Sequence, residues 1–89
     1  MKISADILYN YISDILPLDW VRTQNDSYYD KENINNFIYE TPNSVGLSLG
    51  VKRDVFKNAI KELKKQFADD GIEYTSFEMF SGEVQFGKR

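Results

Sequence analysis

The chain contains no cysteine and no histidine among its 89 residues. Without cysteine it has no disulfide framework, no thiolate nucleophile and no thiolate metal ligand. Without histidine it also lacks the most common general base of enzymes. No phosphate-binding loop, dinucleotide fingerprint or nucleophile elbow offers another route to catalysis. We therefore expect a protein that binds another molecule without a cofactor, and we do not expect an enzyme.

Long apolar runs are absent as well. No stretch of the sequence approaches the length that a membrane-spanning helix requires. The first residues carry an acid at Asp6 and lack the long apolar run of a signal peptide. Together with the absence of cysteine, these features predict a cytoplasmic protein with no membrane partner.

The acidic residues do not indicate a metal site. Asp26, Asp30 and Glu32 cluster in the sequence, but they lack the glycine and the alternating ligand positions of a calcium-binding loop. The segment is better explained as a polar loop that ends with Asp30 as a helix cap. We therefore expect no bound metal.

The residues that are present suit one packed domain. Hydrophobic residues make up 42% of the chain and aromatic residues 15%, which is too apolar for a disordered chain. A length of 89 residues allows a single domain, and no repeat or linker divides residues 1–89.

Charge is distributed unevenly along the chain. The net charge is −3, which argues mildly against a protein that coats DNA unselectively. Residues 1–51 hold three basic and seven acidic side chains, whereas residues 52–89 hold eight basic and seven acidic ones. Six of those eight basic residues lie between Lys52 and Lys65, where they could neutralise the phosphates of a nucleic acid.

Two segments have the apolar spacing of helices. Ser4–Leu16 carries an apolar stripe at intervals of three and four, with Ser4 as the N-cap and Pro17 after the end. Lys52 to Phe67 has one apolar face, and Gly71 is the expected C-terminal breaker. Basic residues occupy the opposite side of this second helix: Arg53, Lys57, Lys61 and Lys64.

Strands are expected on either side of these helices. Trp20–Thr23 predicts a short strand, and Ile72–Phe80 with Glu83–Gly87 predicts a hairpin closed by a turn at residues 81–82. This turn sets a register that pairs Met79 with Val84 and Phe77 with Phe86, so all four share one face of the sheet.

The segment from residue 33 to 51 decides the fold, and it allows two interpretations. In the first, Asp30 caps a helix with Ile34, Phe37 and Ile38 turned inward. Thr41 and Pro42 then begin a second, short helix that runs to Leu49, because Thr is a good N-cap and Pro suits the first helical position. Gly50 makes the turn into the next helix.

Residues 42–87 resemble the winged helix-turn-helix superfamily. The resemblance rests on an apolar residue, a small residue, a Leu-Gly-Val turn and a following apolar stripe, at Val45, Gly46, Leu49, Gly50, Val51, Arg53, Phe56, Ala59, Ile60 and Leu63. It implies an α+β domain in which the helix near Lys52 enters the DNA major groove and the C-terminal β-hairpin acts as a wing. The two glycines and the acidic net charge depart from the family pattern.

In the second interpretation the same segment is a strand. Val45, Leu47, Leu49 and Val51 alternate with small residues, which is the period of two that a strand shows. The strand would pair with residues 37–40 through a turn at Pro42 and Asn43. The fold would then be an α+β sheet with two helices packed on one face.

The first interpretation makes the protein a small DNA-binding transcriptional regulator. The basic side chains of the second helix would contact phosphates and base edges. A homodimer, formed through the N-terminal helix, would supply enough contact with DNA. The residues expected to bind nucleic acid are Lys52, Arg53, Lys57, Lys61 and Lys64.

The alternative is an acidic protein-binding inhibitor or adaptor, encoded by a phage or mobile element, that blocks a nucleic-acid-handling enzyme. Its acidic first half would recognise a basic protein surface. Exposed tyrosines make good interface anchors. The residues expected to bind this partner are Asp26, Tyr28, Tyr29 and Asp30.

Overall fold

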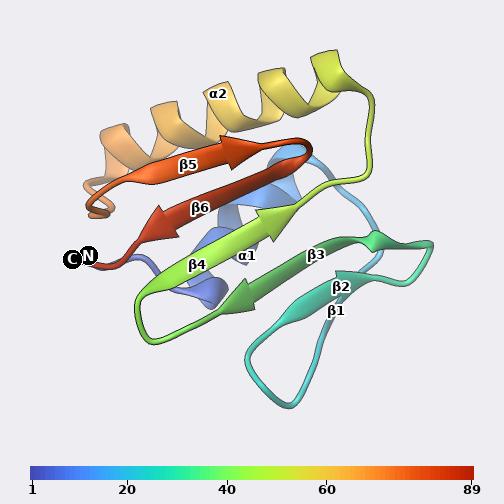
Figure 1. The fold of residues 1–89 in the computed structure, drawn as a ribbon, viewed down its shortest axis with the longest axis horizontal. Coiled ribbons are helices and arrows are strands. Elements are labelled where there is room, and N and C mark those ends of the chain that lie inside the picture. Colours follow the sequence, from blue (N-terminus) through green and yellow to red (C-terminus); the bar gives the residue numbers. More distant parts are fainter.

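Six antiparallel strands form one sheet in the computed structural model, which describes residues 1–89 (Figure 1). Across the sheet the strands follow the order β1-β2-β3-β4-β6-β5, so β1 and β5 are its edges. Along the chain the elements are α1 (Ala5–Ile15), β1 (Trp20–Arg22), β2 (Tyr28–Asp30), β3 (Asn33–Glu40), β4 (Ser44–Ser48), α2 (Arg53–Asp70), β5 (Phe77–Phe80) and β6 (Glu83–Gly87).

Both helices begin and end near the predicted residues. The Ser4 hydroxyl accepts a hydrogen bond from the Ile7 N–H at 3.2 Å and caps α1, as the sequence predicts. Helix α2 ends at Gly71, whose φ of 68° is left-handed. Glycine adopts that conformation without the steric cost that other residues bear. Helix α2 continues three residues beyond the predicted end at Phe67.

The predicted helix that would begin after Asp30 is wrong. Residues 33–40 are strand β3, in which Ile38 is buried and Ile34 is 77% exposed. The Asp30 carboxylate does accept the N–H of Glu32 at 3.0 Å, but this bond closes a local turn between β2 and β3. An aspartate that caps a helix and one that closes a turn use the same hydrogen bond, so the sequence alone did not separate them.

The predicted helix over residues 42–49 is also wrong, and the helix-turn-helix is not present. This segment holds the central strand β4, paired with β3 on one side and β6 on the other. The Thr41 hydroxyl accepts the N–H groups of Asn43 and Ser44, at 3.2 and 3.0 Å. Thr41 therefore closes the turn between β3 and β4. The second interpretation, an α+β sheet with two helices on one face, is the one the structure adopts.

The β5–β6 hairpin has the predicted register, with Met79 opposite Val84 and Phe77 opposite Phe86. It is not a projecting wing, because β6 pairs along its whole length with β4. The two C-terminal strands therefore complete the sheet, and β5 forms its outer edge.

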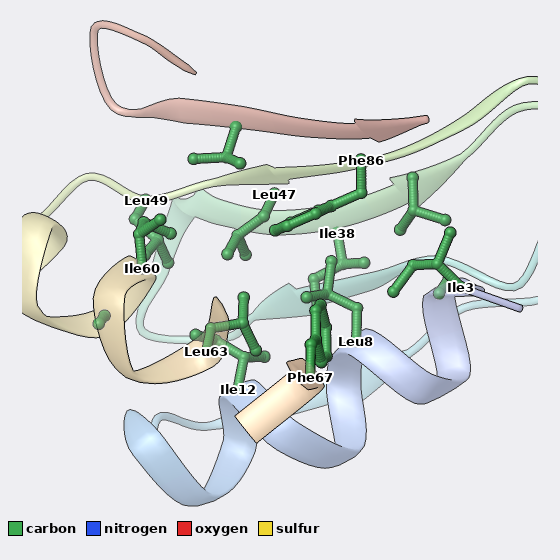
Figure 2. Close-up of a cluster of buried hydrophobic side chains, with 14 of the residues drawn as sticks. Ile3, Leu8, Ile12, Ile38, Leu47, Leu49, Ile60, Leu63, Phe67 and Phe86 are labelled. Carbon is green, nitrogen blue, oxygen red and sulfur yellow. The ribbon is translucent and has the colours of Figure 1, made fainter. Parts of the chain in front are cut away.

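One core lies between the sheet and the two helices. Leu8 and Ile12 of α1 and Leu63 of α2 are fully buried. They point toward side chains of one sheet face, among them Leu47 and Phe86 (Figure 2). Figure 1 shows α1 behind the central strands and α2 running along β5. Both helices cover the same face, and the other face of the sheet has no helix over it.

Candidate binding groove

A groove runs between α2 and the edge strand β5. It consists of two adjoining hollows with volumes of about 670 Å³ and about 270 Å³. Both hollows are lined by Lys57 on the helix and by Met79 on the strand, so they lie next to each other between α2 and β5. Apolar side chains line the larger hollow at its base: Leu49, Val51 and Phe56.

Basic side chains line the helix side of the groove because of their spacing. Arg53, Lys57, Lys61 and Lys64 follow one another at intervals of four, four and three residues, which places them along one flank of a helix. The larger hollow is lined by Arg53 and Lys57, and the smaller one by Lys57, Lys61 and Lys64.

None of these four cations forms an ion pair within the protein. The ion pairs of the structure involve Arg22, Lys88 and the N-terminal amino group. The Lys64 ammonium instead lies 4.3 Å from the centre of the Phe77 ring, a cation–π contact between α2 and β5. The charge along the groove is therefore not neutralised by the protein's own acids.

The strand side of the groove exposes large apolar side chains. Met79 is 53% exposed and Phe80 is 59% exposed, although neighbouring Val84 is fully buried. An apolar strip beside a row of unpaired cations has the composition of a recognition surface, with an apolar centre and a charged rim.

Strand β5 also has no neighbour on its outer side. An edge strand presents unpaired backbone N–H and C=O groups, and proteins often discourage pairing there with lysine side chains. The lysines of α2 stand directly beside this edge.

The structure brings together four of the five residues predicted to bind nucleic acid. Arg53, Lys57, Lys61 and Lys64 line the groove, whereas Lys52 precedes α2 as its N-cap and does not line it. The sequence did not identify the apolar side chains opposite them. Met79 was assigned correctly to the sheet face that bears Val84, but its position at an open edge could not be read from the hairpin alone.

Two of the four residues predicted to bind a basic protein surface are buried in the structure. Tyr28 and Asp30 are buried, with 5% and 3% of their surface exposed. The Tyr28 hydroxyl donates to Asp6, and its ring stacks on Tyr9 at 4.3 Å between centres. Burial, followed by the hydrogen bond to Asp6, raises the pKa of Tyr28.

Asp30 is the centre of a buried hydrogen-bond network. Its carboxylate accepts the Asn36 amide at 2.9 Å and the N–H groups of Glu32 and Asp19. The Asn36 bond does most to lower the pKa of Asp30; burial opposes it, and the two N–H groups support it. Of the four predicted acidic-site residues, only Tyr29 and Asp26 remain exposed.

The structure shows no cluster of three or more side chains suited to hold a metal ion. None of its helices is both long enough and apolar enough to cross a bilayer. No protein-family model, curated protein or solved structure matches this chain.

Proposed function

We propose that the protein is a non-enzymatic binding domain that holds an acidic segment of a partner protein in the groove between α2 and β5. The observation that carries this proposal is the row of unpaired cations, Arg53, Lys57 and Lys61, beside exposed Met79 at the edge of the sheet. Such a domain acts as an adaptor or as an inhibitor, depending on what the bound segment does in its own protein.

The two sides of the groove supply different parts of the binding free energy. Burial of exposed Met79 and Phe80 gives affinity, because apolar area is removed from water. The cations give a faster encounter and select acidic partners, since like charges are repelled. A protein segment with alternating acidic and apolar residues would satisfy both sides.

A selection from random peptides tests the proposal without a known partner. Peptides of about ten residues are long enough for one strand. We expect enriched peptides to be acidic and to bind less tightly as salt rises, because salt screens exposed charges. The double variant Lys57→Glu, Lys61→Glu should weaken their binding by about tenfold or more, which corresponds to about 1.4 kcal/mol.

The matched control is Lys31→Glu, Lys65→Glu. Both of these lysines are exposed, neither lines the groove, and the change in net charge is the same. Equal loss of binding in the two double variants would show a general charge effect and would refute the groove. Failure to enrich acidic peptides would refute it as well.

The same cations support a second candidate, binding of single-stranded nucleic acid. Proteins that bind single strands combine a basic groove with aromatic side chains on which bases stack. Phe80 is exposed for such stacking, but the Lys64 ammonium already lies over the ring of Phe77. A protein segment fits this groove better. Tighter binding of oligothymidine than of any selected peptide, with a steep dependence on salt, would favour nucleic acid instead.

A further inference from the structure

We propose that the partner segment binds as an added β-strand along β5 and extends the sheet beneath the flank of α2. This inference rests on the proposed function, because it specifies how an acidic segment occupies the groove. Strand addition of this kind derives affinity from backbone hydrogen bonds and specificity from the pockets that receive alternate side chains.

The register of the hairpin determines which backbone groups of β5 are free. Phe80 and Glu83 flank the two-residue turn and are therefore a hydrogen-bonded pair. At the other end of the hairpin, the Gly87 N–H donates to the Ser76 C=O at 2.6 Å. Because hydrogen-bonded and non-bonded pairs alternate, the N–H and C=O groups of Phe77 and Met79 point away from β6. These two residues offer four backbone groups to an incoming strand.

The groove has the position that an added strand requires. A new strand would lie about 4.8 Å outside β5. Helix α2 runs along this edge (Figure 1). Its Lys57 and Lys61 line the hollows beside Met79. Alternate side chains of the new strand would therefore face α2, and the others would lie beside Phe80 on the uncovered face of the sheet.

The two hollows specify the side chains that face α2. The larger hollow has Leu49, Val51 and Phe56 in its lining, so it suits an apolar side chain. The smaller hollow is lined by three lysines and by three apolar side chains. It therefore suits an acidic side chain two residues along the added strand, with its methylene groups against the apolar side chains and its carboxylate beside the lysines. The expected ligand is an extended segment that carries an apolar residue and an acidic residue two positions apart.

A second copy of the chain fits this edge less well. Antiparallel pairing of β5 with β5 about a twofold axis would place both α2 helices on the same face of the joined sheet. The two rows that contain Lys57, Lys61 and Lys64 would then approach each other. This repulsion disfavours self-pairing and leaves the edge to an acidic partner.

The deciding experiment compares Met79→Pro with Met79→Ala, using the acidic peptide most enriched from the random library. Both variants lose the methionine side chain, but only proline removes the outward N–H. Proline is tolerated on an edge strand where that N–H faces solvent, so the fold should survive. We expect Met79→Pro to bind about tenfold more weakly than Met79→Ala. Equal affinities would overturn strand addition.

A second measurement leaves the protein unchanged. Two versions of the peptide carry N-methyl groups on alternate amides, one set on odd positions and the other on even positions. Only one set can face β5, so strand addition predicts that one version loses binding and the other retains it. Equal effects of the two versions would overturn strand addition even if Met79→Pro failed to fold.

The outcomes separate the two proposals. One outcome is that Lys57→Glu, Lys61→Glu loses binding, while Met79→Pro and alternate methylation have no effect. This outcome would support the groove for an acidic segment and refute strand addition. Peptide affinity that is unchanged by the charge reversal would refute both proposals. A concentration-dependent dimer that Met79→Pro abolishes would replace the acidic partner with a second copy of the chain.

Discussion

The Lys64 ammonium lies 4.3 Å from the centre of the Phe77 ring and connects α2 with the edge strand β5. Residues 64 and 77 belong to different elements, and no other pair in the structure makes a cation–π contact. The contact sets the position of the helix flank at one end of the groove. It also leaves the other three groove cations free to meet a ligand.

Replacement of Lys64 by glutamine should lower the free energy of unfolding by about 0.5–1 kcal/mol, because the cation–π contact is lost at an exposed site. Chemical denaturation, followed through the single tryptophan Trp20, measures this change. Lys65→Gln is the matched control, since Lys65 is exposed and makes no such contact. Equal effects of the two substitutions would show that the contact adds nothing to stability.

Hydrogen exchange should alternate along β5. The amides of Phe77 and Met79 point outward and should exchange quickly, whereas Glu78 and Phe80 donate to β6 and should be protected. The amides of central strand β4 should be among the slowest, because β4 is paired on both sides. Exchange measured by NMR checks the pattern. Protection of Met79 in the free protein would show that its N–H is not available to a partner.

Gly46→Ala should destabilise the protein by about 1–2 kcal/mol. A Cβ atom at Gly46 would lie 2.3 Å from Cζ of Tyr39, so the tyrosine ring must move. The movement breaks the hydrogen bond that the Tyr39 hydroxyl donates to Glu83 at 2.8 Å. A double-mutant cycle tests this cause: in a Tyr39→Ala background, Gly46→Ala should cost little. An equal loss of stability in the Tyr39→Ala background would show that the clash with Tyr39 is not the cause.

Asn36→Ala should cost about 2 kcal/mol or more. The Asn36 side chain is buried, donates to Asp30 at 2.9 Å and accepts the Gly50 N–H at 2.7 Å. Its removal leaves one oxygen of the buried Asp30 carboxylate and the Gly50 N–H without their partner, although Glu32 and Asp19 still donate to the other oxygen. A buried polar group that loses its partner costs about 1–3 kcal/mol. Asn35→Ala is the control, because Asn35 is exposed and its side chain makes no hydrogen bond. Similar losses in the two variants would refute the network.

Acid should destabilise the protein through Asp30 and Glu40. Burial would raise the pKa of Glu40, but hydrogen bonds from Lys88 at 2.6 Å and from the Ala5 N–H at 2.7 Å lower it overall. The pKa of Asp30 is also lowered. Both folded carboxyl groups therefore bind protons less tightly than the unfolded chain does. Their stabilisation is present above the ordinary carboxyl pKa of about 4 and is lost as pH falls through the lowered values.

Denaturation curves measured from neutral pH down to about pH 3 test this dependence. Glu40→Gln should be less stable at neutral pH and should lose less stability on acidification, because one of the two carboxyl groups is removed. Parallel losses in Glu40→Gln and in the natural protein would show that Glu40 does not contribute to the acid response.

Sequence patterns predicted correctly those features that depend on residues close together in the chain. Ser4 caps α1, Gly71 ends α2, and the two-residue turn fixes the register of Met79 and Val84, all as predicted. Each of these features depends on contacts within a few residues along the chain. The alternation of Val45 and Leu47 also carried the correct signal for β4, but it competed with an equally local helix signal at Thr41 and Pro42.

Only the basic, helical side of the groove could be predicted from the sequence. The period of a helix is visible in sequence, so the row of Arg53, Lys57 and Lys61 could be found, but helical spacing does not show what faces it. The exposed Met79 and Phe80 could not be found, because exposure on β5 depends on its place at the edge of the sheet. That place follows from β6 pairing with β4, a contact between residues about forty positions apart.

The sequence by itself determined the two helices, the hairpin register, and the basic flank of α2, because periodicity and turn chemistry are properties of short segments. Only the tertiary structure decided that residues 44–48 are a central strand and that β5 is left open beside α2. A helix can satisfy its backbone hydrogen bonds within its own segment, whereas a strand must find them in distant ones. The choice between helix and strand was therefore made by the strands on either side of β4.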